Sequence, residues 1–257
     1  MRLHFHEQGQ GEPLVILHGL FGSLDNWTAI ARRLSDRFRV FTIDQRNHGR
    51  SPHCAEMSYP LMAEDLRKFL AVQSVPDTHL LGHSMGGKTA MQLALLHPGL
   101  VRKLGVVDMA PRAYAPAHER LLNALATLDL ASLQDRHEAA TALKADVPDV
   151  SVRRFLLKNL ARDSDGHLRW QFNLEGIRRS YAALNAALDA GRPYHGPALF
   201  IRGSRSDYVR DEDAPGILRL FPNAAFAAIP GAGHWVHADA PHIFADVAAN
   251  FFGGESA

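Results

Sequence analysis

The stretch Gly82-His83-Ser84-Met85-Gly86 most constrains the fold of this chain, because it places a serine in a sharp turn between two regular elements. The apolar run 78–81 before it predicts a buried strand, and residues 88–97 after it show helical spacing that ends at Pro98. A serine between a strand and a helix is held in a strained conformation, with its hydroxyl exposed at the carboxyl edge of a sheet. Ser84 is therefore the candidate nucleophile.

Gly82 and Gly86 fit this interpretation, since a Cβ atom at either position is expected to collide with the neighbouring helix or strand. The alternative interpretation is a glycine-rich turn without chemistry. The strand pattern before the turn and the helix pattern after it favour the catalytic one.

Short apolar runs alternate with helical patterns along most of the chain. The expected strands are Leu3 to Glu7, Leu14 to Leu17, Arg39 to Ile43, Thr78 to Leu81, Lys103 to Val107, Ala198 to Ile201 and Ala225 to Ile229. Continuous apolar runs are typical of strands covered on both faces. The predicted fold class is therefore α/β, with a mostly parallel sheet and helices on both faces.

The alternation stops after Pro111 and resumes near residue 196. Between these points the sequence predicts successive helices and one short extended piece, Leu168 to Phe172. The expected helices are Ala117 to Leu128, Leu133 to Lys144, Ser151 to Ala161 and Leu174 to Leu188. We expect residues 1–110 and 196–257 to form one α/β core domain and residues 111–195 to form a helical insertion packed on it.

Composition excludes several classes of function. The formal net charge of the 257 residues is +1, which indicates neither a nucleic-acid nor a membrane-surface partner. No apolar run approaches the roughly 20 residues of a membrane-spanning helix. Cys54 is the single cysteine, so an intrachain disulfide and a thiolate metal cluster are excluded, in agreement with a cytoplasmic location. The 15 histidines lack the H-E-x-x-H spacing of a zinc site. We expect no metal, and a monomer or small homo-oligomer.

A serine nucleophile needs a neighbouring base, normally an imidazole oriented by a carboxylate. His234 follows the last predicted strand within Gly231-Ala232-Gly233-His234, and the glycines allow its loop to turn back toward Ser84. His234 is the candidate base. Two carboxylates are candidates for the acid: Asp108, which ends the strand at 103–107, and Asp207, which follows the strand at 198–201. The alternative for either aspartate is a carboxylate that caps a helix or fixes a loop.

Four motifs together resemble the α/β-hydrolase family: H-G at 18–19, D-x-R-x-x-G-x-S at 44–51, G-H-S-M-G-G at 82–87 and G-A-G-H at 231–234. More narrowly, H-G-L-F-G-S-L-D-N-W, R-N-H-G-R-S, H-S-M-G-G-K and G-A-G-H-W-V-H resemble the small bacterial YbfF-type esterases. Those enzymes hydrolyse short acyl esters and acyl-CoA thioesters. The resemblance implies that the helical insertion is a cap over the carboxyl edge of the sheet.

The resemblance also implies roles for single residues. YbfF-type esterases have an aspartate at the position of Asp108 and a serine at the position of Ser206, so Asp108 is favoured as the acid and Ser206 is expected to support the Asp108–His234 pair. The backbone N–H groups of Met85 and Leu20 are expected to form the oxyanion hole, with Phe21 as the alternative to Leu20.

We therefore expect a serine esterase without cofactor, acting on a small-molecule ester or thioester of short-to-medium acyl length. The alternatives are a carbon–carbon bond hydrolase or a lipase of the same fold, and a non-catalytic ligand receptor. Halide or epoxide chemistry is disfavoured, because the relatives that perform it have an aspartate where Ser84 stands.

Several further residues have expected structural roles. Lys88, one helical turn beyond Ser84, either reaches the mouth of the site or, more simply, is solvated or caps a helix. His83 is expected to pack away from the site, and His237 to start a helix or support the site from behind. Asn47 and His48 are expected to hold their loop. The aromatic residues of the insertion are either lining of an acyl pocket or, more simply, packing between helices: Tyr114, Trp170, Phe172 and Tyr181.

Overall fold

A seven-stranded sheet organises the computed structural model, which describes residues 1–188 and 191–254. In spatial order its strands are β1 (Phe5–Gln8), β3 (Phe38–Ile43), β2 (Glu12–Leu17), β4 (Thr78–His83), β5 (Val101–Val107), β8 (Ala198–Gly203) and β9 (Ala224–Ile229). β1 pairs antiparallel with β3, and every other neighbouring pair is parallel. The predicted α/β class with a mostly parallel sheet is confirmed.

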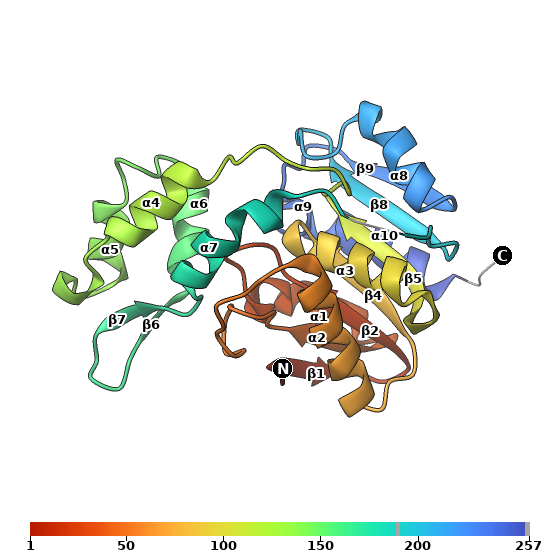
Figure 1. Ribbon diagram of the computed structural model, residues 1–257, viewed down its shortest axis with the longest axis horizontal. Coiled ribbons are helices and arrows are strands. Elements are labelled where there is room, and N and C mark those ends of the chain that lie inside the picture. The colour runs from red at the N-terminus through yellow and green to blue at the C-terminus, as the bar shows by residue number, and fades with distance from the viewer. Residues whose placement is uncertain (189–190, 255–257) are drawn as a thin grey trace.

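Helices cover both faces of this sheet (Figure 1). Successive side chains of a strand point to opposite faces, so Leu14 and Ile16 pack in one apolar cluster while Val15 and Leu17 pack in another. The first cluster includes residues of α1 (Thr28–Leu34) and α10 (Pro241–Gly253). The second includes residues of α2 (Tyr59–Val72), α3 (Met85–Leu96) and α8 (Ala214–Leu220). Burial on both faces explains why these strands are apolar without interruption.

The chain between β5 and β8 forms a separate group of elements, which Figure 1 shows gathered to one side of the sheet. Its members are α4 (Glu119–Thr127), α5 (Arg136–Ala142), α6 (Val150–Leu157), β6 (Leu160–Arg162), β7 (Leu168–Trp170) and α7 (Leu174–Asn185). A third apolar cluster joins these helices to Phe21, Met62 and Met85 of the sheet-bearing part. This group therefore packs against the edge of the fold where Ser84 lies.

One prediction in this region is wrong. The helix expected over residues 151–161 ends at Leu157, and residues 160–162 instead form β6, paired antiparallel with β7 in register Leu160↔Trp170. The carboxylate of Asp163 accepts the backbone N–H groups of Asp165 and His167 and so closes the turn of this hairpin. Pairing with a strand that follows later in the sequence overrides the local helical pattern.

We propose the domain division at residues 110/111 and 195/196, because β5 ends at Val107 and β8 begins at Ala198. The two ranges of this division also contain residues 189–190 and 255–257, which lie outside the described part of the chain. None of the described helices is both long and apolar enough to cross a membrane.

The turn between β4 and α3 depends on close backbone packing at its glycines. A Cβ atom on Gly82 would lie 2.2 Å from the carbonyl oxygen of Gly86, and one on Gly86 would lie 2.5 Å from the carbonyl oxygen of His18. Both distances are far below van der Waals contact. The collision expected at these two positions is confirmed.

We predict that Gly82→Ala lowers the free energy of unfolding by about 2 kcal/mol or more, because the added methyl group meets backbone that cannot rotate away. Gly99→Ala is the matched control, since no atom lies within 4 Å of its added Cβ, and it should change stability by less than about 0.5 kcal/mol. Urea titrations followed by circular dichroism measure both. Equal midpoints for the two variants would contradict the claim.

Candidate active site

Ser84 lies in the turn between β4 and α3, in the region of backbone space that side-chain-bearing residues seldom adopt. Its φ and ψ are 53° and −119°, and its backbone N–H donates to the carbonyl of Val107 at 3.0 Å. Such a conformation costs about 1–3 kcal/mol and persists only when its surroundings enforce it. Here the glycine contacts described above enforce it, and the side chain of Ser84 lines a cavity.

His234 and Asp108 meet beside this cavity. His234 follows β9 after a turn at Gly231, whose φ is 71°, and its Nδ1 atom lies 2.7 Å from Oδ2 of Asp108. Asp108 is fully buried directly after β5. Because a carboxylate only accepts hydrogen bonds, Nδ1 of His234 bears the proton and Nε2 keeps its lone pair. The arrangement therefore leaves a basic nitrogen on the far side of the ring from Asp108.

Two further groups donate hydrogen bonds to the Asp108 carboxylate. The Ser206 hydroxyl donates to the same Oδ2 atom, and the backbone N–H of Gly203 donates to Oδ1 at 3.3 Å. Asp207, the alternative acid, is exposed at the rim of the cavity, and its carbonyl oxygen accepts from Nε of Arg210 at 3.3 Å. His234 thus contacts Asp108, and Ser206 contacts the same carboxylate.

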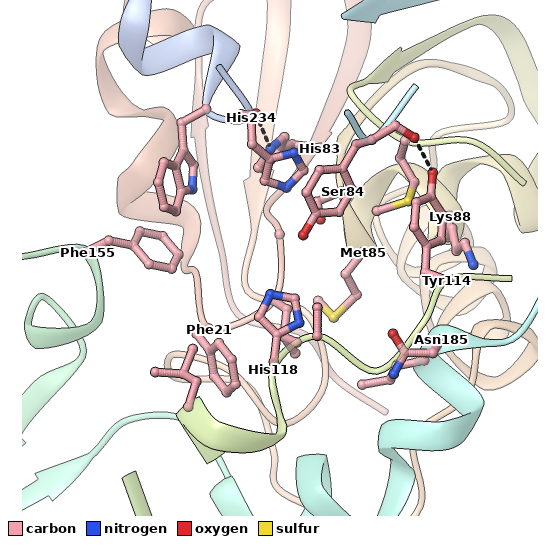
Figure 2. A pocket seen from close by; sticks show the side chains of 18 of the residues that line it. Phe21, His83, Ser84, Met85, Lys88, Tyr114, His118, Phe155, Asn185 and His234 are labelled. Atoms are coloured by element: carbon pink, nitrogen blue, oxygen red, sulfur yellow. Dashed lines mark hydrogen bonds between the residues drawn. The ribbon is translucent and has the colours of Figure 1, made fainter. Parts of the chain in front are cut away.

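Ser84 and His234 line the same cavity, as Figure 2 shows. Within the described residues no hydrogen bond joins the Ser84 hydroxyl to the His234 imidazole. Such bonds are often long in proteins without substrate and tighten when substrate binds. The two side chains therefore share one reaction space.

The backbone donors expected around the oxyanion differ in their availability. Met85 is the first residue of α3, so its N–H has no partner within the helix, and both Met85 and Leu20 line the cavity. The N–H of Phe21 instead donates to Nε2 of His48 at 3.1 Å. Phe21 is therefore already engaged, and Leu20 is the better donor of the two.

His48 accepts this bond because burial fixes its protonation. Burial lowers the pKa of His48 to about 3, so the ring is neutral, and its Nδ1 donates to the carbonyl of Arg46 at 2.9 Å. The other nitrogen is then free to accept from Phe21. Asn47, with φ of 64°, accepts the N–H of Cys54 through its side-chain oxygen at 2.7 Å. The expectation that Asn47 and His48 hold their loop is confirmed.

His83 does more than the packing expected of it. Its Nε2 donates to the backbone carbonyl of His234 at 2.9 Å, and the two rings lie 4.6 Å apart (Figure 2). Burial holds the pKa of His83 well below its ordinary value, so the ring stays neutral. His83 therefore fixes the main chain of the candidate base, which the sequence pattern did not indicate. His237 lies in α9 (Val236–Asp239) and stacks on Trp27 at 4.2 Å.

The cavity has a volume of about 510 Å³ and two chemically different sides. Figure 2 shows Phe21 and Phe155 on one side of Ser84, and Lys88, Tyr114 and Asn185 on the other. Of the four aromatic residues singled out in the insertion, Tyr114 and Tyr181 line the cavity. The other two, Trp170 and Phe172, stack on each other at 5.1 Å in the third apolar cluster.

Lys88 lines the cavity and is not solvated, so the expectation of a solvated lysine is wrong. Its side chain is buried, its Nζ atom donates to the carbonyl of Ala186 at 2.6 Å, and the rings of Tyr59 and Tyr114 lie 5.4 Å and 5.0 Å from that atom. Ala186 is the residue at the C-terminal end of α7, so Lys88 caps a helix of the insertion from the sheet side. Burial lowers the pKa of Lys88 to about 8.

Within the described residues one cluster of potential metal ligands occurs, formed by Asp163, Asp165 and His167. One ligand atom of each lies within 4.8 Å of the others. Their backbone and carboxylate groups form the β6–β7 turn described above. The cluster does not line the cavity that holds Ser84.

The lowered pKa of Lys88 predicts a pH-dependent stability. Between about pH 8 and the ordinary lysine value near 10.5 the unfolded chain keeps a proton that the folded chain releases, so stability rises with pH in this window. We expect the free energy of unfolding of the wild type, minus that of Lys88→Met, to increase by about 2 kcal/mol from pH 8 to pH 10. Denaturant titrations across this range measure the difference. A difference that stays constant with pH would refute the assignment.

Comparison with known proteins places this geometry in a family. Residues 12–241 match the model of the alpha/beta hydrolase fold. The chain is 42% identical over 250 residues to the sn-1-specific diacylglycerol lipase ABHD11 of Xenopus laevis, covering 94% of this chain and 80% of the relative. It is 37% identical over 235 residues to esterase YbfF of Escherichia coli, covering 91% and 90% of the two chains.

A solved structure agrees closely with this one. A marine microorganism esterase superposes with a TM-score of 0.95 at 45% identity, covering 97% of this chain and 99% of that one. The resemblance to YbfF-type esterases expected from the motifs is confirmed. The chain belongs to the α/β-hydrolase fold family.

Proposed function

We propose that this protein is a serine esterase that hydrolyses short-to-medium acyl esters or thioesters through an acyl-enzyme intermediate. Relatives named esterase and lipase support a hydrolase that acts on ester bonds. The observation that most directly supports a serine mechanism is the 2.7 Å hydrogen bond between Nδ1 of His234 and Asp108, beside the cavity that Ser84 lines.

The proposed reaction begins with attack of the Ser84 hydroxyl on the ester carbonyl while Nε2 of His234 takes its proton. The negative oxygen of the tetrahedral intermediate is stabilised by the backbone N–H groups of Leu20 and Met85. Collapse of the intermediate expels the alcohol or thiol, which receives the proton from His234, and leaves the acyl group on Ser84. Water, deprotonated by His234, then releases the acid and restores the enzyme. No cofactor enters these steps.

In this scheme Asp108 holds the tautomer of His234 and stabilises the imidazolium form. Burial makes this carboxylate effective, because a charge pair interacts more strongly where water is excluded. The Ser206 hydroxyl and the Gly203 N–H occupy other lone pairs of the carboxylate and limit its rotation. Asp207 lies in the solvent-exposed rim and takes no part in the scheme.

A lipase is the second candidate, since the similarity to proteins named diacylglycerol lipase extends over 94% of the chain. A non-catalytic receptor is disfavoured, because a buried aspartate hydrogen-bonded to a histidine beside a strained serine costs stability that ligand binding alone does not require. The acyl-chain length of the preferred substrate distinguishes an esterase from a lipase, and catalytic turnover distinguishes both from a receptor.

We predict that the wild type hydrolyses 4-nitrophenyl butyrate and that Ser84→Ala lowers kcat by about 10⁴-fold or more, because the nucleophile is lost. Rapid quenching followed by intact-mass measurement should show one butyryl adduct on the wild type and none on Ser84→Ala. Residual turnover by Ser84→Ala within tenfold of the wild type would rule out the proposed nucleophile.

The two candidate acids predict opposite results for a matched pair of substitutions. Asp108→Asn should lower kcat by roughly 10²- to 10⁴-fold, because the amide cannot hold His234 in the required tautomer. Asp207→Asn, an identical change at the exposed neighbouring aspartate, should alter kcat by less than about threefold. Steady-state assays with 4-nitrophenyl butyrate compare them, and the reverse pattern would assign the acid to Asp207.

A further inference from the structure

Lys88 places a cation in the wall of the cavity beside the proposed nucleophile. It lies on α3 one helical turn after Ser84, and its backbone N–H donates to the Ser84 carbonyl at 3.1 Å. Both residues line the same cavity. The backbone hydrogen bond therefore fixes the start of α3 to the residue that carries the proposed nucleophile, and the Lys88 side chain lies in the wall of the same cavity.

This ammonium group is under-satisfied within the described residues. It has three donors, and the carbonyl of Ala186 is its one hydrogen-bond acceptor there. No carboxylate among those residues forms an ion pair with it. The charged side chain that acts on it electrostatically is Arg112, which is also a cation and repels it. A buried charge without a counter-charge is costly, and an anion that enters the cavity would relieve that cost.

The other polar groups around Lys88 already donate to backbone carbonyls. The Tyr59 hydroxyl donates to the Leu184 carbonyl at 2.7 Å, and the Tyr114 hydroxyl donates to the Tyr208 carbonyl at 2.7 Å. The side-chain amide of Asn185 donates to the Tyr181 carbonyl at 2.9 Å. These donors are committed to backbone carbonyls, and Arg112, which also lines the cavity, is paired with Asp213 at 2.7 Å. Among the described residues Lys88 is therefore the cation at this side of the cavity without a carboxylate partner.

The opposite side of the cavity suits the leaving group of the ester. Phe155 contacts Trp235, the neighbour of His234, with ring centres 5.6 Å apart. In the proposed reaction His234 delivers a proton to the leaving oxygen, so the leaving group must lie on the His234 side. That side is apolar, with Phe21 and Phe155 in Figure 2, whereas Lys88 lies across Ser84 from them, where the acyl group extends.

We propose that Lys88 forms a carboxylate subsite for the acyl part of the substrate, so that the preferred substrates are monoesters of short dicarboxylic acids with an apolar alcohol. This inference rests on the proposed serine-esterase function and names its substrate class. Because both residues line one cavity of about 510 Å³, short diacids of three to five carbons are the ones to test.

The test compares each charged ester with an uncharged ester of the same shape. Monobenzyl malonate, succinate and glutarate are paired with benzyl 3-methylbutanoate, 4-methylpentanoate and 5-methylhexanoate, and benzyl alcohol release gives kcat/KM for each. We expect at least one charged member to exceed its partner tenfold or more in the wild type. Lys88→Met should lower that ratio at least tenfold, and Lys88→Arg, which keeps the charge, should retain a preference for the charged ester.

The ratio is measured within one variant, so a lower fraction of folded enzyme cancels from it. Lys103→Met is the matched control, because Lys103 is also buried and donates to a backbone carbonyl, that of Phe251 at 3.1 Å, but does not line this cavity. Its ratio should equal that of the wild type.

Three outcomes would overturn the inference. If the wild type shows no charged preference in any pair, the subsite does not exist. If Lys88→Met lowers both members of each pair equally, Lys88 serves only to hold α7. In these two cases the proposed esterase function still stands if the neutral esters are cleaved by the wild type and not by Ser84→Ala. If the wild type cleaves no ester, 4-nitrophenyl butyrate included, both the esterase function and the carboxylate subsite are wrong.

Discussion

The close backbone packing around Gly82 and Gly86 is the constraint on which the rest of the site depends. It brings the start of α3 against the chain at His18, near enough that a single methyl group would not fit. Ser84 can hold a φ of 53° only because this packing prevents relaxation. The same close packing places the Met85 N–H near the loop that contains Leu20. One steric constraint therefore positions both the proposed nucleophile and the proposed oxyanion donors.

Much of this arrangement follows from the sequence because its signals are local. Apolar runs predict the sheet, and residues at the carboxyl ends of parallel strands must meet at one edge, which makes both Asp108 and Asp207 candidates to contact His234. The resemblance to YbfF-type esterases favours Asp108, and Asp108 is the residue that contacts His234. The insertion was predicted less well. Its β6 strand pairs with residues that come later, and Lys88 is buried beside Tyr59, Tyr114 and the carbonyl at the end of α7, which come from distant parts of the chain. Neither feature leaves a periodic signature in the sequence.

Burial divides the histidines of this site into two kinds. His48 and His83 are neutral because burial lowers the pKa of each, and each then donates through one nitrogen, His48 also accepting through the other. They act as rigid connectors between loops. His234 retains partial exposure, with 20% of its side chain accessible, and contacts a buried carboxylate. A residue type that appears scattered in the sequence is thus sorted by environment into scaffold and candidate base.

The same reasoning explains why a cation beside the nucleophile is compatible with the proposed chemistry. The buried Lys88 side chain lines the same cavity as Ser84, and its positive charge does not oppose the negative oxygen of the tetrahedral intermediate. The aromatic faces of Tyr59 and Tyr114 lower the cost of keeping it charged when no anion is bound. Lys88 also holds the end of α7, so one side chain couples the position of the insertion to the charge inside the cavity. Binding of an anion at the proposed subsite would stabilise the charged ammonium, which also donates to the carbonyl at the end of α7.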